Sequence, residues 1–477
     1  IKAMKITYIT HACLLIEIQG IRILTDPWLV GSCWAGAHWH YPPPKRTPES
    51  FTDIDFLYFS HAHEDHFQME SINRLPPKIK NTKVIISDFD KPYFERAIKA
   101  VGFTDVKVMQ HDESTSLVPG VTLDMIRNDK GDDDSSIVLK GDGSTVFCQT
   151  DNLMSVNEAE RLGRKYDVDV LFTINTQTGM FPGFFDFPEE TMMELSKKKI
   201  DSSAKYSVDV VKALNAKTIV PYASDMCYLG ELYFANDLHY ADKNEYAKLV
   251  NHTLPKATVH VMGPEDFMNV NDGNVVVSMT PQKYTRKNLG AYAVEMREKV
   301  AEVEREERKY INLPFDSDVK IFRNTLDELM SSWQDDSFKV LWVIVDPRGI
   351  KSHFWHNMPD KTSNDEINNE YNLRIEIPTY TIQRLVRGDY SMGGVTIRNG
   401  SVRCHRYVKG LTKKEADRII SAGEGKLEIS LDLGISAAEI IIKEGFAHIK
   451  GQKIALQEFS RLKEKSCYIM EGNTLHK

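Results

Sequence analysis

The feature that most constrains this chain is a cluster of metal-binding side chains directly after an apolar run. The run "IDFLYF" is typical of a buried strand, and "SHAHEDHF" follows it at once. The cluster has an H-x-H-x-D-H pattern made by His61, His63, Asp65 and His66. On a loop that leaves a strand, this spacing lets the first two histidines bind one metal. The aspartate and the last histidine can then turn toward a second metal, so the pattern predicts a dinuclear centre.

A dinuclear centre needs more ligands than one loop supplies, and a bridging carboxylate is the usual solution. Asp151 lies in "FCQTDN", at the end of another β-rich run. We therefore expect Asp151 to complete the site, with capping of the following helix as the alternative role.

The composition is that of a globular protein rather than a nucleic-acid or membrane protein. The 477 residues are 42% hydrophobic, and the formal net charge of -8 lacks the basic excess expected for nucleic-acid binding. No apolar run approaches the roughly 18 residues that a membrane span needs. The six cysteines are scattered, and the N-terminus lacks the features of a secretion signal, with Met4 as the expected native start. We therefore expect a cytoplasmic protein with a small-molecule substrate.

The order of the predicted elements indicates two similar halves. β-rich runs such as "MKITYIT" and "ACLLIEI" precede a helix–strand unit, and a second set from "VTLDMIRN" to "STVFCQTDN" precedes further helix–strand units. This is the outline of a four-layer αββα sandwich, an α/β (α+β) fold. We predict that the sandwich spans residues 4–282, that a solvated connecting helix spans 283–312, and that a smaller α+β domain spans 313–477. The smaller domain could form a lid, a pocket or a homodimer contact.

The histidine pattern, the later Thr-Asp strand end and the opening segment together resemble the metallo-β-lactamase superfamily. The opening "ITHACLLIEIQGIRILTDPWL" is similar to the start of the branch that contains ascorbate-6-phosphate lactonase and N-acylphosphatidylethanolamine phospholipase D. The resemblance implies that Asp26 braces the histidine loop and that His11 lies near the metals.

Two departures from the superfamily pattern narrow the resemblance. No histidine occurs from residue 112 to 238, so the histidines that normally flank the "SSIVL"-type and "IVP"-type strands are missing. With Asp134, Asp151 and the P-Y-A turn at 221–223, the chain instead resembles the catalytic domain of CMP-N-acetylneuraminate hydroxylase. That family also carries a Rieske domain, and nothing in this sequence matches its Cys-x-His pairs. If the protein activates O2, we therefore expect its electrons to come from another protein or from the substrate.

Two enzymatic functions follow from these ligands. An aspartate in place of a histidine makes the site richer in oxygen, which favours iron or manganese over zinc. We expect a di-iron, O2-dependent oxygenase or hydroxylase acting on a small polar metabolite, in which Asp134 binds metal or orients a histidine. The alternative is a zinc or manganese hydrolase, in which a bridging hydroxide attacks a lactone, ester or phosphodiester. A metal-binding protein without catalysis is a third possibility. The candidate catalytic residues are Asp65, His11, Asp225 and His239, the last two acting on the leaving group of a hydrolase.

Weaker signals concern residues that could line the site. "CWAGAHWHYPPPKR" follows the "DPWL" run, where the superfamily carries a flap over the metals, so His38 and His40 are candidate substrate contacts. "TQTGMFPGFFDF" is a candidate pocket wall through Phe181 and Phe184, and Tyr222 in the P-Y-A turn is a further candidate. For both segments, an ordinary proline-anchored or packing loop is the alternative.

Overall fold

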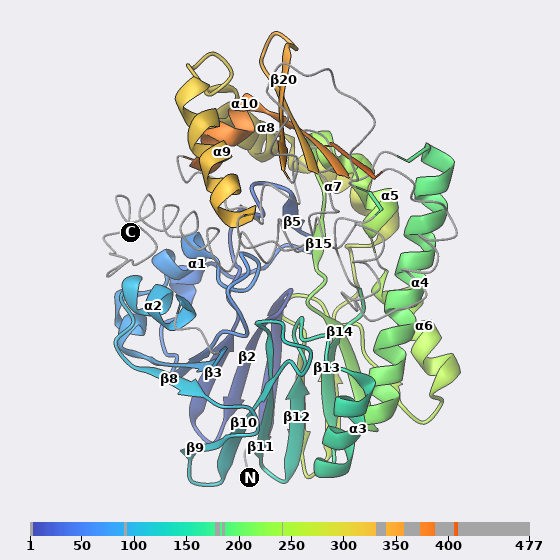
Figure 1. Ribbon diagram of the computed structural model, residues 1–477. Helices are drawn as coiled ribbons and strands as arrows, with labels where there is room; N and C mark the ends of the chain where they lie inside the picture. Colours follow the sequence, from blue (N-terminus) through green and yellow to red (C-terminus); the bar gives the residue numbers. More distant parts are fainter. Residues whose placement is uncertain are drawn as a thin grey trace.

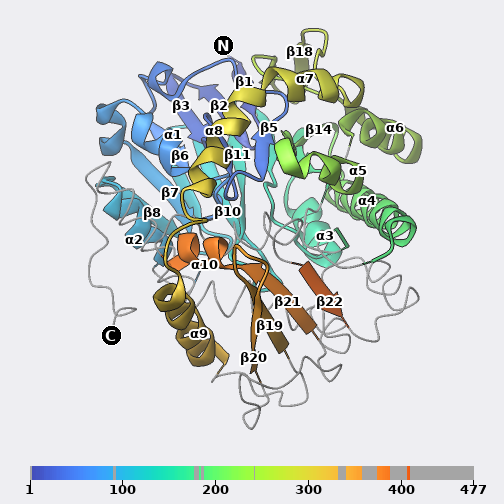
Figure 2. The same cartoon turned by 90° about the horizontal axis from the view of Figure 1, so that it is seen from above.

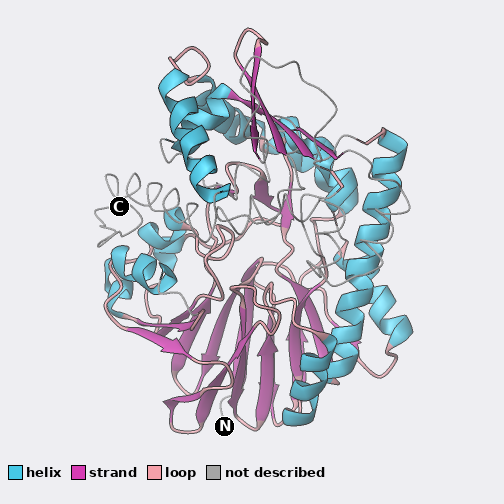
Figure 3. Ribbon diagram, in the orientation of Figure 1, coloured by secondary structure: helices cyan, strands magenta, loops and turns pink. Residues whose placement is uncertain are grey.

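Two large sheets pack face to face, and helices cover both outer faces (Figures 1 and 3). The computed structural model describes residues 3–89, 93–176, 182–183, 187–240, 242–330, 340–356, 373–386 and 405–408. The four layers confirm the predicted αββα fold class, because one apolar core lies between the sheets and two others lie under the helices.

The first sheet carries the histidine loop. Its order is β18 (Asn274–Ser278), β17 (Phe267–Asn271), β1 (Met4–Thr10), β2 (Cys13–Ile18), β3 (Ile21–Thr25), β6 (Phe56–Tyr58), β7 (Lys83–Ser87) and β8 (Val106–Met109). Helices α1 (Met69–Arg74) and α2 (Tyr93–Ala100) cover its outer face. Its central strands are therefore buried on both faces, and β1 buries even the polar residues Thr7 and Thr10.

The second sheet carries the acidic candidates. Its order is β16 (Thr258–Val259), β14 (Thr218–Tyr222), β13 (Val170–Ile174), β12 (Ser144–Cys148), β11 (Ser135–Gly141), β10 (Val121–Arg127) and β9 (Ser114–Val118). Its outer helices are α3 (Val156–Lys165), α4 (Glu189–Leu214) and α6 (Lys243–Thr253). Strands β12, β13 and β14 are parallel, so their carboxyl ends meet at one edge.

Local sequence explains several element ends. The β11–β12 hairpin turns at Asp142 and Gly143, both with left-handed backbone, as the "GDGS" segment predicts. Helix α3 begins after Ser155, whose hydroxyl accepts a hydrogen bond from the Glu158 amide. Helix α4 is longer than the predicted helix around "AKYSVDVVKALN". The sequence does not indicate its first half, because that half is mostly polar and lacks an apolar stripe.

A small three-stranded sheet lies at the end of the sandwich, formed by β15 (Met226–Cys227), β5 (His38–His40) and β4 (Ser32–Cys33). We define residues 32–40 as the flap. The segment after the sandwich forms two helices, α7 (Leu289–Glu295) and α8 (Arg297–Arg308), rather than one solvated helix. Leu289, Tyr292 and Val300 of these helices are buried in one cluster with Trp39, Tyr41 and Cys227. Helix α8 crosses over this end of the sandwich (Figure 2), so the connecting segment supports the flap.

The smaller C-terminal part is α+β, consistent with the prediction. Its sheet has the order β20 (Lys351–His356), β19 (Val340–Val345), β21 (Leu373–Pro378) and β22 (His405–Val408), next to α9 (Asp316–Met330) and α10 (Thr379–Val386). It lies beyond the loop end of the sandwich (Figure 1). The remaining short helices are α5 (Asn236–His239), η1 (Pro48–Ser50), η2 (Pro77–Asn81), η3 (Gly230–Ala235) and η4 (Arg286–Asn288). Among the described residues, no helix has both the length and the hydropathy to cross a membrane. The predicted domain boundaries stay predictions.

Candidate metal centre

The candidate ligands gather at one end of the sandwich although they come from both sheets. His11 follows β1, and the histidine loop follows β6 in the same sheet. Asp134 precedes β11 and Asp151 follows β12 in the second sheet. Two groups of side chains there bring their ligand atoms within 4.8 Å of one another: His11, Asp65 and His66; and His61, His66 and Asp151.

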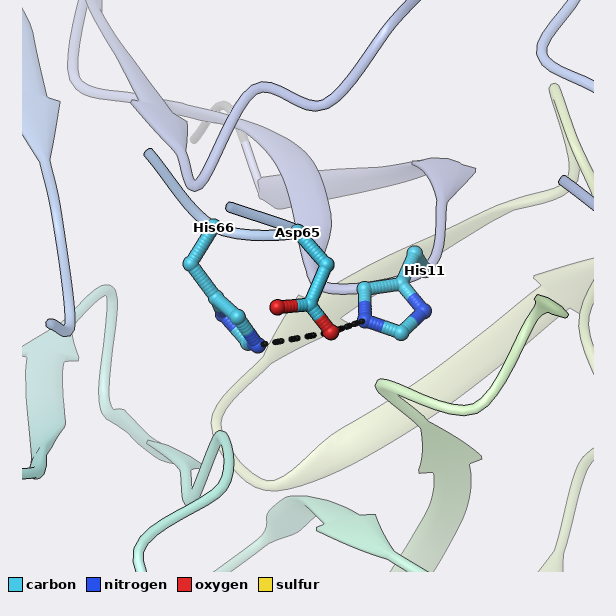
Figure 4. A group of neighbouring side chains, drawn as sticks. All are labelled: His11, Asp65 and His66. Carbon is cyan, nitrogen blue, oxygen red and sulfur yellow. Dashed lines mark ion pairs between the residues drawn. The ribbon is translucent and has the colours of Figure 1, made fainter. Parts of the chain in front are cut away.

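The first group is drawn in Figure 4, where Asp65 lies between the two imidazoles. Asp65 Oδ2 is 3.4 Å from His11 Nε2 and 3.9 Å from His66 Nε2. Two ligand atoms that each lie about 2.1 Å from one ion are about 3 to 4 Å apart, so the spacing fits a shared cation. All three residues are buried, with His66 0% exposed.

The second group joins the histidine loop to the second sheet. His66 Nε2 lies 3.2 Å from Asp151 Oδ2, and His61 Nε2 lies 2.7 Å from His63 Nδ1. The close approach of two ring nitrogens suits a pair of ligands on one ion. His61 and His63 therefore lie close enough to share an ion, although their binding of a metal stays a prediction. Asp151 reaches His66 of the same loop.

Asp26 braces the histidine loop, as the resemblance implies. Its carboxylate accepts from the Ser60 amide at 2.8 Å and the Ser60 hydroxyl at 2.7 Å, and it lies 2.9 Å from His66 Nδ1. This contact fixes the ring so that Nε2 faces Asp65 and Asp151. Burial lowers the pKa of His66, but the carboxylates of Asp151, Asp65 and Asp26 outweigh burial and raise it well above its usual value. The site therefore has a strong excess of negative potential, which suits a cation.

Asp134 faces Nδ1 of His61, whereas Nε2 is the ring nitrogen that faces the candidate metal site. Its Oδ1 is 3.0 Å from His61 Nδ1. An imidazole that binds a metal through Nε2 keeps a proton on Nδ1, so this geometry favours the predicted orienting role over direct ligation. Burial and the nearby His66 lower the pKa of His61 to about 4, which keeps the ring neutral and able to bind metal.

The residues fit a bound metal because several buried atoms lack hydrogen bonds. His11 Nδ1 and Nε2, His66 Nε2, Asp65 Oδ1 and Asp151 Oδ1 have no hydrogen-bond partner in the part of the chain that the structure describes. Leaving a buried polar atom unsatisfied costs about 1–3 kcal/mol. Five such atoms in one place indicate a missing partner, and a cation bound by nitrogen and oxygen satisfies them together.

Residues with left-handed backbone lie just after the strands that carry the candidate ligands and their supporting groups. His11, Asp26 and Thr150 have φ values of 48°, 35° and 58°. Non-glycine residues in this region cost of order 1–3 kcal/mol, so the surrounding contacts must hold them. The Thr150 amide donates to Tyr222 Oη at 2.7 Å, which fixes the turn just before Asp151.

Three predicted residues near the centre have structural contacts of their own. Tyr222 is 0% exposed in the central core, and its hydroxyl holds Thr150, so its substrate contact stays a prediction without support here. His40 stacks on Trp28 with ring centroids 3.8 Å apart, and its Nε2 lies 3.0 Å from the Trp28 carbonyl. Burial lowers the pKa of His40 to about 3. The carboxylate of Asp225 accepts from Tyr8 and the His11 amide, which gives no support to its predicted action on a leaving group.

His38 is the flap residue that best fits a substrate contact. It is 2% exposed, its Nε2 lies 3.1 Å from Tyr228 Oη, and its Nδ1 has no hydrogen-bond partner among the described residues. Burial lowers its pKa to about 4, although the Asp65 carboxylate opposes the shift. His239 lies 5.9 Å from Tyr228 between ring centroids and belongs to neither ligand group. Its catalytic role stays a prediction, and Phe181 and Phe184 lie outside the described residues.

Two residues without a sequence signal tie the flap to the histidine loop. Glu64 is the second unassigned position of the H-x-H-x-D-H pattern, and its carboxylate accepts from the Trp34 amide at 2.5 Å. Trp34 lies edge-on to His63, with ring centroids 5.1 Å apart. Residues Trp34, Ala35 and Gly36 all have left-handed backbone, which no propensity of Trp or Ala predicts.

Comparison with known proteins agrees with this architecture. Residues 5–177 match the family model of a beta-lactamase superfamily domain. The domain has the metallo-β-lactamase fold. This confirms both the fold and the superfamily resemblance that the sequence predicts.

Proteins to which this chain is similar include hydroxylases and a hydrolase. The cytidine monophosphate-N-acetylneuraminic acid hydroxylase of Xenopus laevis is 25% identical over 313 residues, covering 62% of this chain and 48% of that protein. The chain therefore spans about half the length of this curated relative. CmlA, a diiron beta-hydroxylase from Streptomyces venezuelae, has a TM-score of 0.38 at 16% identity and covers 58% of this chain and 55% of its own. An isothiocyanate hydrolase from Delia radicum gut bacteria has a TM-score of 0.41 at 15% identity and covers 58% of this chain and 100% of its own.

Proposed function

We propose that this protein is a di-iron oxygenase that uses O2 to hydroxylate a small polar substrate. The observation that carries the proposal is the buried set of His11, Asp65 and His66, with Asp65 between the two imidazoles. Two histidines and one carboxylate with open positions are typical of iron(II) oxygenases. The hydroxylase relative, although it matches over part of its length, supports the same chemistry.

The chain's own residues would hold two metals in adjacent sites. We assign His61 and His63 to the first metal, His11, Asp65 and His66 to the second, and Asp151 to the position between them. Two bound irons would supply the redox chemistry that O2 activation needs. The Asp151 side chain is 24% exposed, so the substrate approaches from its side.

The flap shields the other side of the centre. Trp34 is 8% exposed and packs against His63, so it covers one side of that ligand. The neutral ring of His38 offers Nδ1 as one hydrogen-bonding group to a polar substrate. Tyr228 fixes the direction of this ring through Nε2.

The second candidate function is a metal-dependent hydrolase, and His11 favours it. A histidine beside Asp65 and His66 supplies the kind of ligand that the missing last histidine of the superfamily hydrolases would provide. A zinc ion held by nitrogen-rich ligands is suited to water activation. The substrate class would then be a lactone, an ester or a phosphodiester.

Metal analysis combined with two activity assays separates the candidates. The chain is purified without added metal from medium holding equal iron and zinc, and the bound metals are counted. Oxygen uptake is measured with ascorbate as reductant, and hydrolysis with bis-p-nitrophenyl phosphate and a simple lactone. We expect about two irons per chain and oxygen uptake that His66→Ala abolishes. Bound zinc with hydrolytic turnover and no oxygen uptake would instead establish the hydrolase.

A further inference from the structure

A buried charged cluster lies directly behind His11, and the function proposed above does not use it. We define the Asp225 cluster as Tyr8, Asp225 and Lys243. Tyr8 is 0% exposed and Asp225 is 2% exposed. The Lys243 ammonium donates to the Asp225 carboxylate and, at 2.8 Å, to the Tyr8 hydroxyl, which in turn lies against Asp225. One carboxylate and one ammonium are thus paired, and a buried pair of this kind is costly to break.

The Asp225 cluster contacts the backbone of His11 rather than its ring. The His11 amide donates to Asp225 Oδ2 at 2.9 Å, and the Tyr8 hydroxyl lies 3.1 Å from the His11 carbonyl. The same carbonyl accepts from the Ala223 amide at 3.0 Å. His11 and Ala223 both have left-handed backbone, with φ values of 48° and 54°. Such a turn persists only where contacts hold it, and the cluster supplies two of these contacts.

The ring of His11 has few contacts that set its direction. Neither ring nitrogen forms a hydrogen bond among the described residues, and Nε2 lies 3.4 Å from Asp65 Oδ2 in an ion-pair contact. The ring touches Trp28 and His66 edge-on, with centroids 5.3 Å and 5.4 Å away. The backbone turn that carries the imidazole therefore contributes to its direction together with Asp65.

We propose that Asp225, supported by Tyr8 and Lys243, is a positioning residue that fixes His11 as a ligand of the second metal. The inference rests on the proposed function, because it assumes that His11 binds metal. Asp225, which follows β14 in the second sheet, would then support His11, which follows β1 in the first sheet. Removing the carboxylate should loosen the His11 turn and weaken one metal site while the other keeps its ligands.

The test is a titration of the metal-free full chain with Co(II), followed by visible absorption. We expect the wild-type chain to bind two equivalents. In Asp225→Ala, the second equivalent should bind about 10–100-fold more weakly, the usual effect of losing an outer support, while the first is unchanged. His11→Ala should weaken the second equivalent at least as much. The double variant should be no weaker than His11→Ala alone, because both changes act through one ligand.

Two further variants keep the test decisive if Asp225→Ala does not fold. Asp225→Asn retains an oxygen for the His11 amide and should recover part of the lost affinity. Tyr8→Phe removes only the hydroxyl and should weaken the second equivalent by a smaller factor. The matched control is Asp124→Asn in the second sheet, where a buried aspartate accepts from Lys140 and Tyr166, both at 2.8 Å. It has the same three residue types, and both equivalents should be unchanged.

Two results would overturn the inference about Asp225. One is that Asp225→Ala lowers the Co(II) affinity of both equivalents equally. The other is that it leaves the affinity of the second equivalent unchanged and lowers only the unfolding temperature. A different result bears on the proposed function. If His11→Ala leaves the Co(II) affinity of both equivalents unchanged, His11 is not a ligand. The proposed assignment of the metal ligands then fails, whatever the result for Asp225.

Discussion

The loops of the first sheet supply every imidazole of the candidate centre, whereas the loops of the second sheet supply Asp134, Asp151 and Asp225. The first sheet also contributes two carboxylates, Asp65 within the histidine loop and Asp26 behind it. Every nitrogen ligand therefore comes from one half of the sandwich, whereas carboxylates come from both halves. This difference teaches that metal preference can change through the second sheet alone, since the first retains a complete set of histidines.

Among the variants that test the two sheets, removal of the His66 imidazole should have the largest effect on metal affinity. His66 belongs to both ligand groups, so His66→Ala should lower Fe(II) affinity by more than about 100-fold, beyond the loss of an outer support. Isothermal titration of the metal-free chain with Fe(II) measures the effect. His111→Ala is a suitable control, because this histidine has a half-exposed side chain outside both groups. Two tightly bound equivalents in His66→Ala would refute its shared role.

Loss of the brace behind His66 should have the next largest effect. Asp26→Asn replaces the carboxylate that contacts Ser60 and His66 Nδ1, so we expect metal affinity to fall by about 10–100-fold. The same titration checks it, together with urea unfolding of the metal-free chain. If unfolding changes and metal affinity does not, Asp26 stabilises the loop without orienting the ligand.

Changing the second sheet should alter which metal is bound. Asp151→His places a nitrogen ligand where the wild-type chain has a carboxylate 3.2 Å from His66 Nε2. We expect the zinc-to-iron ratio to rise several-fold in protein grown with equal metals, since a nitrogen-rich site suits zinc. Metal analysis measures the ratio, with Asp133→His in another loop of the second sheet as the control. An unchanged ratio would show that the second sheet does not set metal preference.

The smallest effect concerns the buried histidines of the flap. Burial lowers the pKa of His40 to about 3, so only the unfolded chain takes up its proton between pH 6.5 and 3. Stability should therefore fall as the pH drops below 6.5, by up to about 1.4 kcal/mol per pH unit for this group. Urea unfolding at pH 7 and pH 5 measures the loss, which His40→Gln should reduce. An equal pH dependence in both proteins would contradict the assignment.

The sequence predicts the fold and the histidine loop because both depend on local patterns. Apolar strands, the "GDGS" hairpin and the H-x-H-x-D-H spacing act over short distances, and each appears where predicted. The place of Asp151 near the end of a strand is also predictable, since only Gln149 and Thr150 separate it from β12. These features need no knowledge of how the sheets pack.

The support of the centre is less predictable, because it joins residues far apart in the chain. Tyr8, Asp225 and Lys243 meet only after β1, the segment after β14 and the start of α6 have packed together. The burial of α7 and α8 against Trp39 of the flap is hard to predict for the same reason, since it depends on residues far apart in the chain. The charged sequence of this segment, taken alone, indicates exposure. The left-handed turn at His11 belongs to the same long-range arrangement, because it is held by contacts with Asp225 and Ala223.

The shared position of His66 has a consequence for how the protein is loaded. One ring nitrogen can serve only one ion at a time, and Asp26 occupies the vicinity of the other nitrogen. His66 can therefore complete only one ligand group at a time, and we assign it to the group with His11 and Asp65. The other group would hold an ion without this imidazole, so we expect the two sites to fill at different metal concentrations.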